Sequence, residues 1–404
     1  MGERQGAVED LVMTTTAPPE PVRPVEFSLW LNVFRWIAAW IVVFNHAGGI
    51  LIVPLSELPG SQRTIMGYGF SFIAGFAHHA VMVFFVLSGF LVGGAFCKDT
   101  SRGKANLPAY FSKRATRLWI VVLPALVLTW ACSRLGLWIF PGAGSGIYGA
   151  DKLANFGPGT FACNSVYLQN VLCMWYGGNA SLWSLYHEAW YYVVFPFFAL
   201  GLSAATTGRR LAFVLPGIAI LAVLQLGQVS NPPIIPYFGI WLMGVAAALV
   251  RVRSWRYQVP VAACAFIVVL AVQRVVFVPT ADPGLSVKSF ALDVLVSGLF
   301  SCLLVAMRGA TNLKTVPLGK LNGALAGFSF SLYCIHVPLL LLYASASMAV
   351  LGFGYQTQAL TFSHWALVYG GVLFAVIGGF MFSRVTERYT NQLRRFVLGR
   401  TRVD

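Results

Sequence analysis

Long stretches of apolar residues with almost no charged side chains recur along this 404-residue chain. Hydrophobic residues make up 58% of the chain and charged residues only 10%, against roughly 25% charged residues in a typical soluble domain. A helix of about twenty apolar residues crosses roughly 30 Å of hydrocarbon. Because a water-soluble core cannot bury this much apolar surface, the sequence predicts an all-α, polytopic membrane helix bundle.

The apolar stretches number about ten, and the positive charges between them alternate in density. Lys and Arg concentrate in every second connection, in segments such as KRATR, GRR and RVRSWR. Positively charged residues favour the cytoplasmic side of a membrane, so this asymmetry predicts a multi-pass protein of the plasma (inner) membrane with both termini cytoplasmic. The predicted spans are 29–53, 77–97, 117–140, 182–202, 211–228, 233–250, 258–279, 288–307, 324–348 and 363–386.

One transmembrane domain over residues 27–388 accounts for nearly the whole chain. Residues 1–26 are polar and Pro-containing, which indicates a disordered cytoplasmic tail rather than a signal peptide. Residues 389–404 form a basic cytoplasmic tail. The net charge of +15 is spread over the connections, so we expect the lipid bilayer as a partner and no nucleic acid. The sequence does not indicate an oligomeric state.

The seven cysteines show no CxxC motif and no Cys/His cluster, so we expect no metal or redox centre. Cys163 and Cys173 both fall in the long connection at about 141–181, which we place outside the cytoplasm, where a disulfide can persist. The sequence leaves the pair open, bridged or free. Gly and aromatic residues in this connection (PGAGSGIYG) indicate a partly re-entrant cap over a cavity.

Ionisable side chains inside the predicted spans are few, and a membrane makes such groups costly unless they have a partner or a function. Arg35 and His46 share the first span and lie about 16 Å apart along a helix. The arginine can bind a phosphate or carboxylate, and a neutral imidazole can deprotonate a hydroxyl. Alternatively, Arg35 reaches back to the inner surface and His46 is a packed interior histidine. For Asp293 we expect an ion pair with Arg134 or Arg274.

Five short motifs occur in a fixed order along nearly the whole chain: FRWIAAWIVVFNHAGG, FFVLSGFLVGG, YFSKRATRLWIVVLP, SLWSLYHEAWYYVVFP and FSFSLYCIHVPLL. In this order they resemble the membrane acyltransferase-3 family, which makes 27–388 an acyltransferase-3-like domain. The resemblance implies an O-acyltransferase that moves an acyl group, most often acetyl, from cytoplasmic acyl-CoA to a hydroxyl. Acyl-CoA is then the co-substrate, no metal is required, and the acceptor is a carbohydrate, a cell-surface polysaccharide or a glycosylated metabolite.

The resemblance also implies roles for individual residues. It makes His46 the catalytic base and Arg35 and Glu188 its catalytic partners, with Glu188 orienting the imidazole. It assigns acyl-CoA binding to Arg35, Arg114, Arg117, Ser88 and Gly89, and acceptor binding to Trp183, Tyr333 and His336. The family often has a second acidic residue beside the first, whereas Glu188 here lies between His187 and Ala189.

Each role has a simpler alternative. Arg114 and Arg117 are also consistent with the ordinary positive charge of cytoplasmic connections. Glu188 is also consistent with a buried polar residue that serves only packing, and His336 with a histidine of the core. We interpret Glu387 as structural. A transporter or flippase for a glycan or small molecule is the alternative function; such proteins often show two similar halves with unwound helices, and we find no such repeat.

Overall fold

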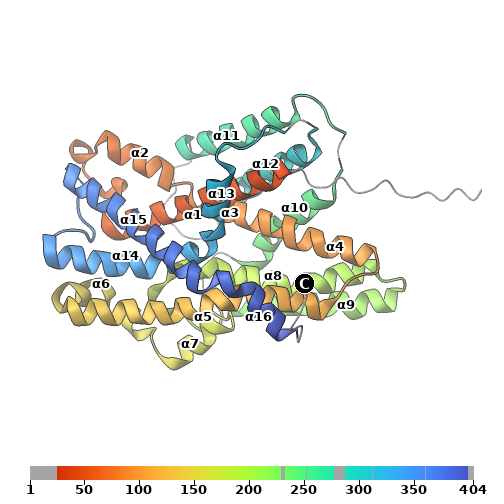
Figure 1. Ribbon diagram of the computed structural model, residues 1–404, viewed down its shortest axis with the longest axis horizontal. Helices are drawn as coiled ribbons and strands as arrows, with labels where there is room; N and C mark the ends of the chain where they lie inside the picture. Colours follow the sequence, from red (N-terminus) through yellow and green to blue (C-terminus); the bar gives the residue numbers. More distant parts are fainter. Residues whose placement is uncertain are drawn as a thin grey trace, which may run out of the picture.

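The computed structural model describes residues 25–228, 233–251, 253–276, 287–311, 313–359 and 361–398. Nearly all of the tail predicted over 1–26 therefore lies outside the described residues. Within these ranges the fold is all-α, as predicted, with no named β-strand. The principal helices run roughly along the long axis of the molecule (Figure 1).

Ten helices follow the predicted spans in order. They are α1 (Val25–Leu51), α3 (Ala77–Ser88), α5 (Leu107–Ile139), α8 (Trp183–Ser203), α9 (Thr207–Gly227), α10 (Ile234–Leu249), α11 (Gln258–Val276), α12 (Val287–Gly309), α14 (Ser329–Leu351) and α15 (Phe362–Val385). Six further helices lie between or after them: α2 (Ile65–Ala74), α4 (Gly94–Ser101), α6 (Pro141–Ala154), α7 (Pro158–Ser165), α13 (Gly319–Gly327) and α16 (Thr390–Val397).

Eight helical segments within the described ranges are long and apolar enough to cross a membrane. The two predicted spans not among them correspond to α8 and α10. Helix α8 has 21 residues, but Ser184, His187 and Glu188 lower its apolar character. Helix α10 has 16 residues, which is about 24 Å at 1.5 Å per residue and short of the hydrocarbon thickness. The multi-pass bundle is thus confirmed, and ten crossings remain a prediction.

Helix α14 lies at the centre of one half of the bundle. It packs against α1, α5, α6 and α15, and every residue from Ser331 to Leu341 is buried. A helix that is enclosed on all sides can carry a polar side chain only where a partner from a neighbouring helix meets it. Tyr333 and His336 lie in this enclosed segment.

Helix α5 carries the KRATR segment from the connection into the bundle. The side chain of Asn106 caps its first turn by accepting a hydrogen bond from the Ala109 backbone amide at 2.9 Å. The helix then continues for 33 residues. Arg114 and Arg117 therefore sit on its first turns, at the same end of the molecule as α16, which packs against α5.

The long connection at 141–181 is helical and rests on the bundle. Helix α6 packs against α5 and α14, and the Tyr148 hydroxyl donates a hydrogen bond to the Cys132 carbonyl at 3.1 Å. Cys163 and Cys173 are joined in a disulfide. The sequence left this pair open, and the structure resolves it in favour of the bridge.

Glycines bring α10 into backbone contact with α3 and with the π-helical turn η3 (Gly89–Gly93) that follows it. A Cβ atom on Gly89 would lie 1.9 Å from the Trp241 carbonyl oxygen, and one on Gly244 would lie 2.0 Å from the Val86 carbonyl oxygen. The two helices therefore require glycine on both sides of the contact. This contact positions Trp241 beside Ser88.

We expect Gly244→Ala to lower the free energy of unfolding by about 1–3 kcal/mol, because backbone must move to admit the methyl group. Gly239→Ala in the same helix is the matched control, since a Cβ there meets nothing within 4 Å. Alanine should leave the stability unchanged or raise it slightly at that position. Thermal unfolding of the detergent-purified variants measures both effects, and equal midpoints would contradict the close backbone contact.

Candidate active site

Two histidines that are far apart in the sequence meet inside the bundle. Nδ1 of His46 on α1 lies 2.7 Å from Nε2 of His336 on α14, and the two rings stack with their centroids 4.9 Å apart. His336 is fully buried, whereas His46 is partly exposed. The pair forms because α1 and α14 pack side by side.

The hydrogen bonds of His336 determine which nitrogen of His46 carries a proton. Nδ1 of His336 lies 3.1 Å from the Leu332 carbonyl oxygen and must donate to it, since a carbonyl only accepts. In the neutral ring Nε2 of His336 is then an acceptor, so Nδ1 of His46 donates to it. The lone pair of His46 is thereby left on Nε2, which has no hydrogen-bond partner among the residues the structure describes. This is the arrangement that a general base requires.

A small cavity lies about one turn along α14 from this histidine pair, toward Arg35. Its volume is about 70 Å³, far below the roughly 300–1,000 Å³ of typical small-molecule sites, so it can receive only the end of a ligand. The Tyr333 and Ser184 hydroxyls in its wall are hydrogen-bonded at 2.6 Å. The wall consists of Arg35, Val81, Phe84, Phe85, Arg117, Ser184, Ser329, Phe330 and Tyr333.

Positive charge gathers between this cavity and the surface near α16. Arg35 and Arg117 both line the cavity, and Arg394 on α16 is close enough to Arg114 and Arg117 for their charges to interact. Within the described ranges no carboxylate lies within ion-pairing distance of these four guanidiniums. Nε of Arg114 and Nε of Arg394 are buried without a hydrogen-bond partner there. Guanidiniums without an ion-pair partner, such as those of Arg114, Arg117 and Arg394, are suited to bind phosphate groups.

A chain of hydrogen bonds runs from α10 to α8 through Ser88 of the FFVLSGFLVGG motif. Trp241 donates its indole N–H to Ser88 Oγ at 3.1 Å, and Ser88 in turn bonds the Tyr192 hydroxyl at 3.0 Å. Because Tyr192 donates its own hydroxyl proton to Glu188, the Ser88 hydroxyl must donate to Tyr192. Arg114 lies over the Tyr192 ring at 5.8 Å. Ser88 and Gly89 thus hold helices together, and their predicted contact with acyl-CoA remains a prediction.

The predicted catalytic residues do not form one contiguous group. Glu188 bonds Tyr192 and does not orient His46, whose partner is His336. Glu188 instead lies within charge-interaction range of Arg35. The structure therefore separates two centres: the His46 and His336 pair, and a charged cluster around Arg35. The part of the sequence-based hypothesis in which Glu188 positions the imidazole is wrong, because α8 presents this carboxylate toward the Arg35 end of the bundle.

Two other expectations have clear outcomes. Asp293 pairs with His78 and His79, not with Arg134 or Arg274; the sequence reasoning passed over both histidines because they stand at the edge of the predicted span 77–97. Glu387 accepts a hydrogen bond from the Ser331 backbone amide at 2.8 Å, which fits its structural interpretation as a carboxylate at the start of α14.

Trp183 lines neither cavity described for this structure. Its ring packs edge-on to Phe85 and to His187, and its carbonyl accepts a hydrogen bond from Nδ1 of His187 at 3.0 Å. Arg394 was missed by the sequence reasoning, although the Arg-Arg pair in the C-terminal segment is a signal that could have indicated it.

A multi-pass helical membrane protein with an interior histidine pair and an arginine-lined cavity is the class of protein that this fold and site define. A family model described as an acyltransferase domain, Acyl_transf_3, matches residues 28–384. The chain belongs to this family and is an acyltransferase. Searches of curated proteins and of solved structures found no significant match.

Proposed function

We propose that this acyltransferase transfers an acyl group, most often acetyl, from cytoplasmic acyl-CoA to a hydroxyl of a carbohydrate, a cell-surface polysaccharide or a glycosylated metabolite. The observation that supports this most is the unpaired Nε2 lone pair of His46, which the bond to His336 directs. A fixed tautomer with a free basic nitrogen is what proton abstraction from a hydroxyl needs.

In the proposed reaction Nε2 of His46 removes the proton from the acceptor hydroxyl while its oxygen attacks the thioester carbonyl carbon. The new C–O bond forms, the C–S bond breaks, and the CoA thiolate takes the proton back from the imidazolium. His336 supports this step because its Nε2 accepts the Nδ1 proton of His46 in both protonation states. The partner of His46 is a histidine and not a serine or cysteine, which favours direct transfer over an acyl-enzyme.

The donor enters from the arginine-lined end. Arg114, Arg117 and Arg394 bind the phosphates of CoA at the surface, and the small cavity admits the thioester end. Tyr333 lines that cavity, and its ring lies 6.0 Å from that of His336, so its hydroxyl is the donor available to the negative charge that develops on the thioester oxygen. Arg35 lines the same cavity about three turns along α1 from His46 and contributes to binding of the acyl donor. The basic connections support a cytoplasmic location for this end, with both termini on the same side.

We expect Arg117→Gln to weaken the binding of coenzyme A by roughly 10-fold or more, since a hydrogen bond to a charged group contributes about 1.5–3 kcal/mol. The affinity for pantetheine, which lacks the phosphates, should not change. Arg209→Gln is the control, because Arg209 is an exposed arginine at the start of α9. Calorimetric titration of the purified variants measures these affinities. Equal losses for coenzyme A and pantetheine would rule out phosphate recognition by Arg117.

A further inference from the structure

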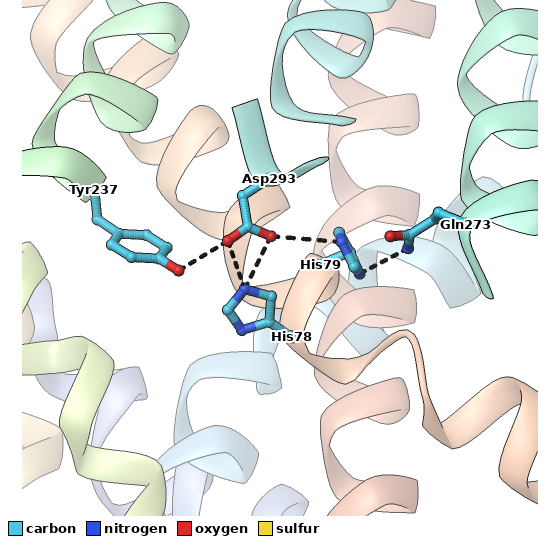
Figure 2. Close-up of polar contacts among 5 residues, drawn as sticks. All are labelled: His78, His79, Tyr237, Gln273 and Asp293. Atoms are coloured by element: carbon cyan, nitrogen blue, oxygen red, sulfur yellow. Dashed lines mark hydrogen bonds and ion pairs between the residues drawn. The ribbon is translucent and has the colours of Figure 1, made fainter. Parts of the chain in front are cut away.

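A second polar cluster surrounds Asp293, which is 2% exposed. Nε2 of His78 lies 3.0 Å and 2.9 Å from its two carboxylate oxygens, and the Tyr237 hydroxyl donates to it at 2.8 Å. Nε2 of His79 lies 3.5 Å from Oδ1. Figure 2 shows the carboxylate enclosed by these three side chains, which come from α3 and α10. His78 and Tyr237 are thus the hydrogen-bond donors to this buried carboxylate, and Nε2 of His79 lies near it without a hydrogen bond.

The hydrogen bonds determine the proton positions on both rings. The Gln273 amide nitrogen donates to Nδ1 of His79 at 3.1 Å, so the proton of His79 is on Nε2, on the side of Asp293. Nε2 of His78 donates to the carboxylate and leaves a lone pair on Nδ1. Figure 2 shows this second nitrogen directed away from Asp293. The side chain of His78 is 45% exposed, so this basic nitrogen is accessible.

His78 lines a large cavity between α1, α2 and α15. Its volume is about 960 Å³, at the upper end of the roughly 300–1,000 Å³ of small-molecule sites. Its wall includes Asn45, which directly precedes His46 on α1, and the largely buried Trp365 on α15. The cavity therefore reaches the helix that carries His46, although its lining includes neither His46 nor His336.

Two arginines contribute positive charge to the wall of this cavity. Arg63 and Arg274 line it, and among the residues that the structure describes its lining contains no Asp or Glu. Arg63 donates Nε to the Leu58 carbonyl at 2.9 Å, and Arg274 donates Nη2 to the Ser71 carbonyl at 2.9 Å. These backbone bonds orient the guanidiniums without neutralising them, and Nε of Arg274 is buried without a partner among the described residues.

We propose that this cavity binds the acceptor, and that the acceptor is a polyhydroxylated molecule carrying a carboxylate or a phosphate. Nδ1 of His78, oriented by Asp293, accepts a hydrogen bond from one acceptor hydroxyl, and Arg274 and Arg63 bind the anionic group. The inference rests on the proposed function, since it names the acceptor class for the hydroxyl that His46 deprotonates. An uncharged sugar would offer no anionic partner to the guanidinium of Arg274, whose Nε is buried without a hydrogen bond among the described residues.

The test compares two probes that differ only in the anionic group, p-nitrophenyl β-D-glucuronide and p-nitrophenyl β-D-glucoside. Ligand-observed NMR titration of the full chain in detergent measures both dissociation constants. We expect the glucuronide to bind roughly 10-fold more tightly, as a charge-assisted bond predicts. Arg274→Gln should abolish this preference. Lys288→Gln, a charge change at an exposed residue of α12 outside the cavity lining, should preserve it.

His78→Phe should weaken both probes, because the ring is kept and the hydroxyl acceptor is lost. Competition by glucose 6-phosphate would extend the site to phosphates, and its failure to compete would restrict the site to carboxylates. Equal affinities for the two probes, no saturable binding of the glucuronide, or a preference that survives Arg274→Gln would each overturn the proposal.

Coenzyme A titrated into the same preparations separates the two hypotheses. Binding of coenzyme A without binding of the glucuronide refutes only this inference, whereas no binding of coenzyme A refutes the proposed function.

Discussion

His46→Ala should lower the rate of acyl transfer per folded molecule by roughly 10² to 10⁴-fold, the usual contribution of a general base. The substitution should lower the turnover number, because the partly exposed imidazole acts on the acceptor hydroxyl. It should not affect donor binding, because the proposed phosphate contacts are made by arginines at the other end of the bundle. Coenzyme A should bind the variant with unchanged affinity. Acyl transfer by purified protein, with titration of coenzyme A in parallel, measures both quantities.

The control for this variant is His364→Ala, a change of the same type in α15 at a histidine that lines neither cavity. A histidine needed only for packing would reduce thermal stability and leave activity in proportion to folded protein. Wild-type turnover in His46→Ala would remove this residue from the active site and with it the proposed mechanism.

His336→Leu should also reduce turnover strongly, by roughly 10² to 10⁴-fold, because the residue sets the tautomer of the base; loss of the tautomer-setting carboxylate in serine proteases costs about 10⁴-fold. Leucine cannot accept the Nδ1 proton of His46, so the lone pair is no longer directed to Nε2. The Michaelis constant for the acyl donor should stay near its wild-type value, since His336 does not line the small cavity that Arg35 and Arg117 line.

The conservative variant His336→Gln separates positioning from packing. Its amide oxygen can accept the proton from Nδ1 of His46, so we expect it to recover much of the activity that leucine loses. Both variants remove a ring from a fully buried position, so both should lose similar stability in thermal unfolding. Equal activities of the leucine and glutamine variants would show that His336 does not act through its hydrogen bond.

Much of the architecture follows from composition and charge order. The apolar stretches predicted an all-α membrane bundle, and the longer helices occur at the predicted places. The positions of Arg35 and His46 on one helix, and of Arg114 and Arg117 on one face of another, follow from helical periodicity alone. The five ordered motifs indicated the acyltransferase-3 family, which the match over residues 28–384 confirms.

The partners of the buried polar groups depend on how the helices pack. His46 and His336 are 290 residues apart, and His78 and Asp293 are 215 apart. In a membrane the faces toward lipid and toward other helices are both apolar, so hydrophobic periodicity does not indicate which helices are neighbours. Helix α14 is an example, since it is buried on every side and its sequence has no polar face. The sequence therefore determined the class of protein, the helix order and the ionisable residues available for catalysis. Only the tertiary structure decided that His336 orients His46 and that Asp293 orients His78, because those contacts arise from helix packing across the bundle.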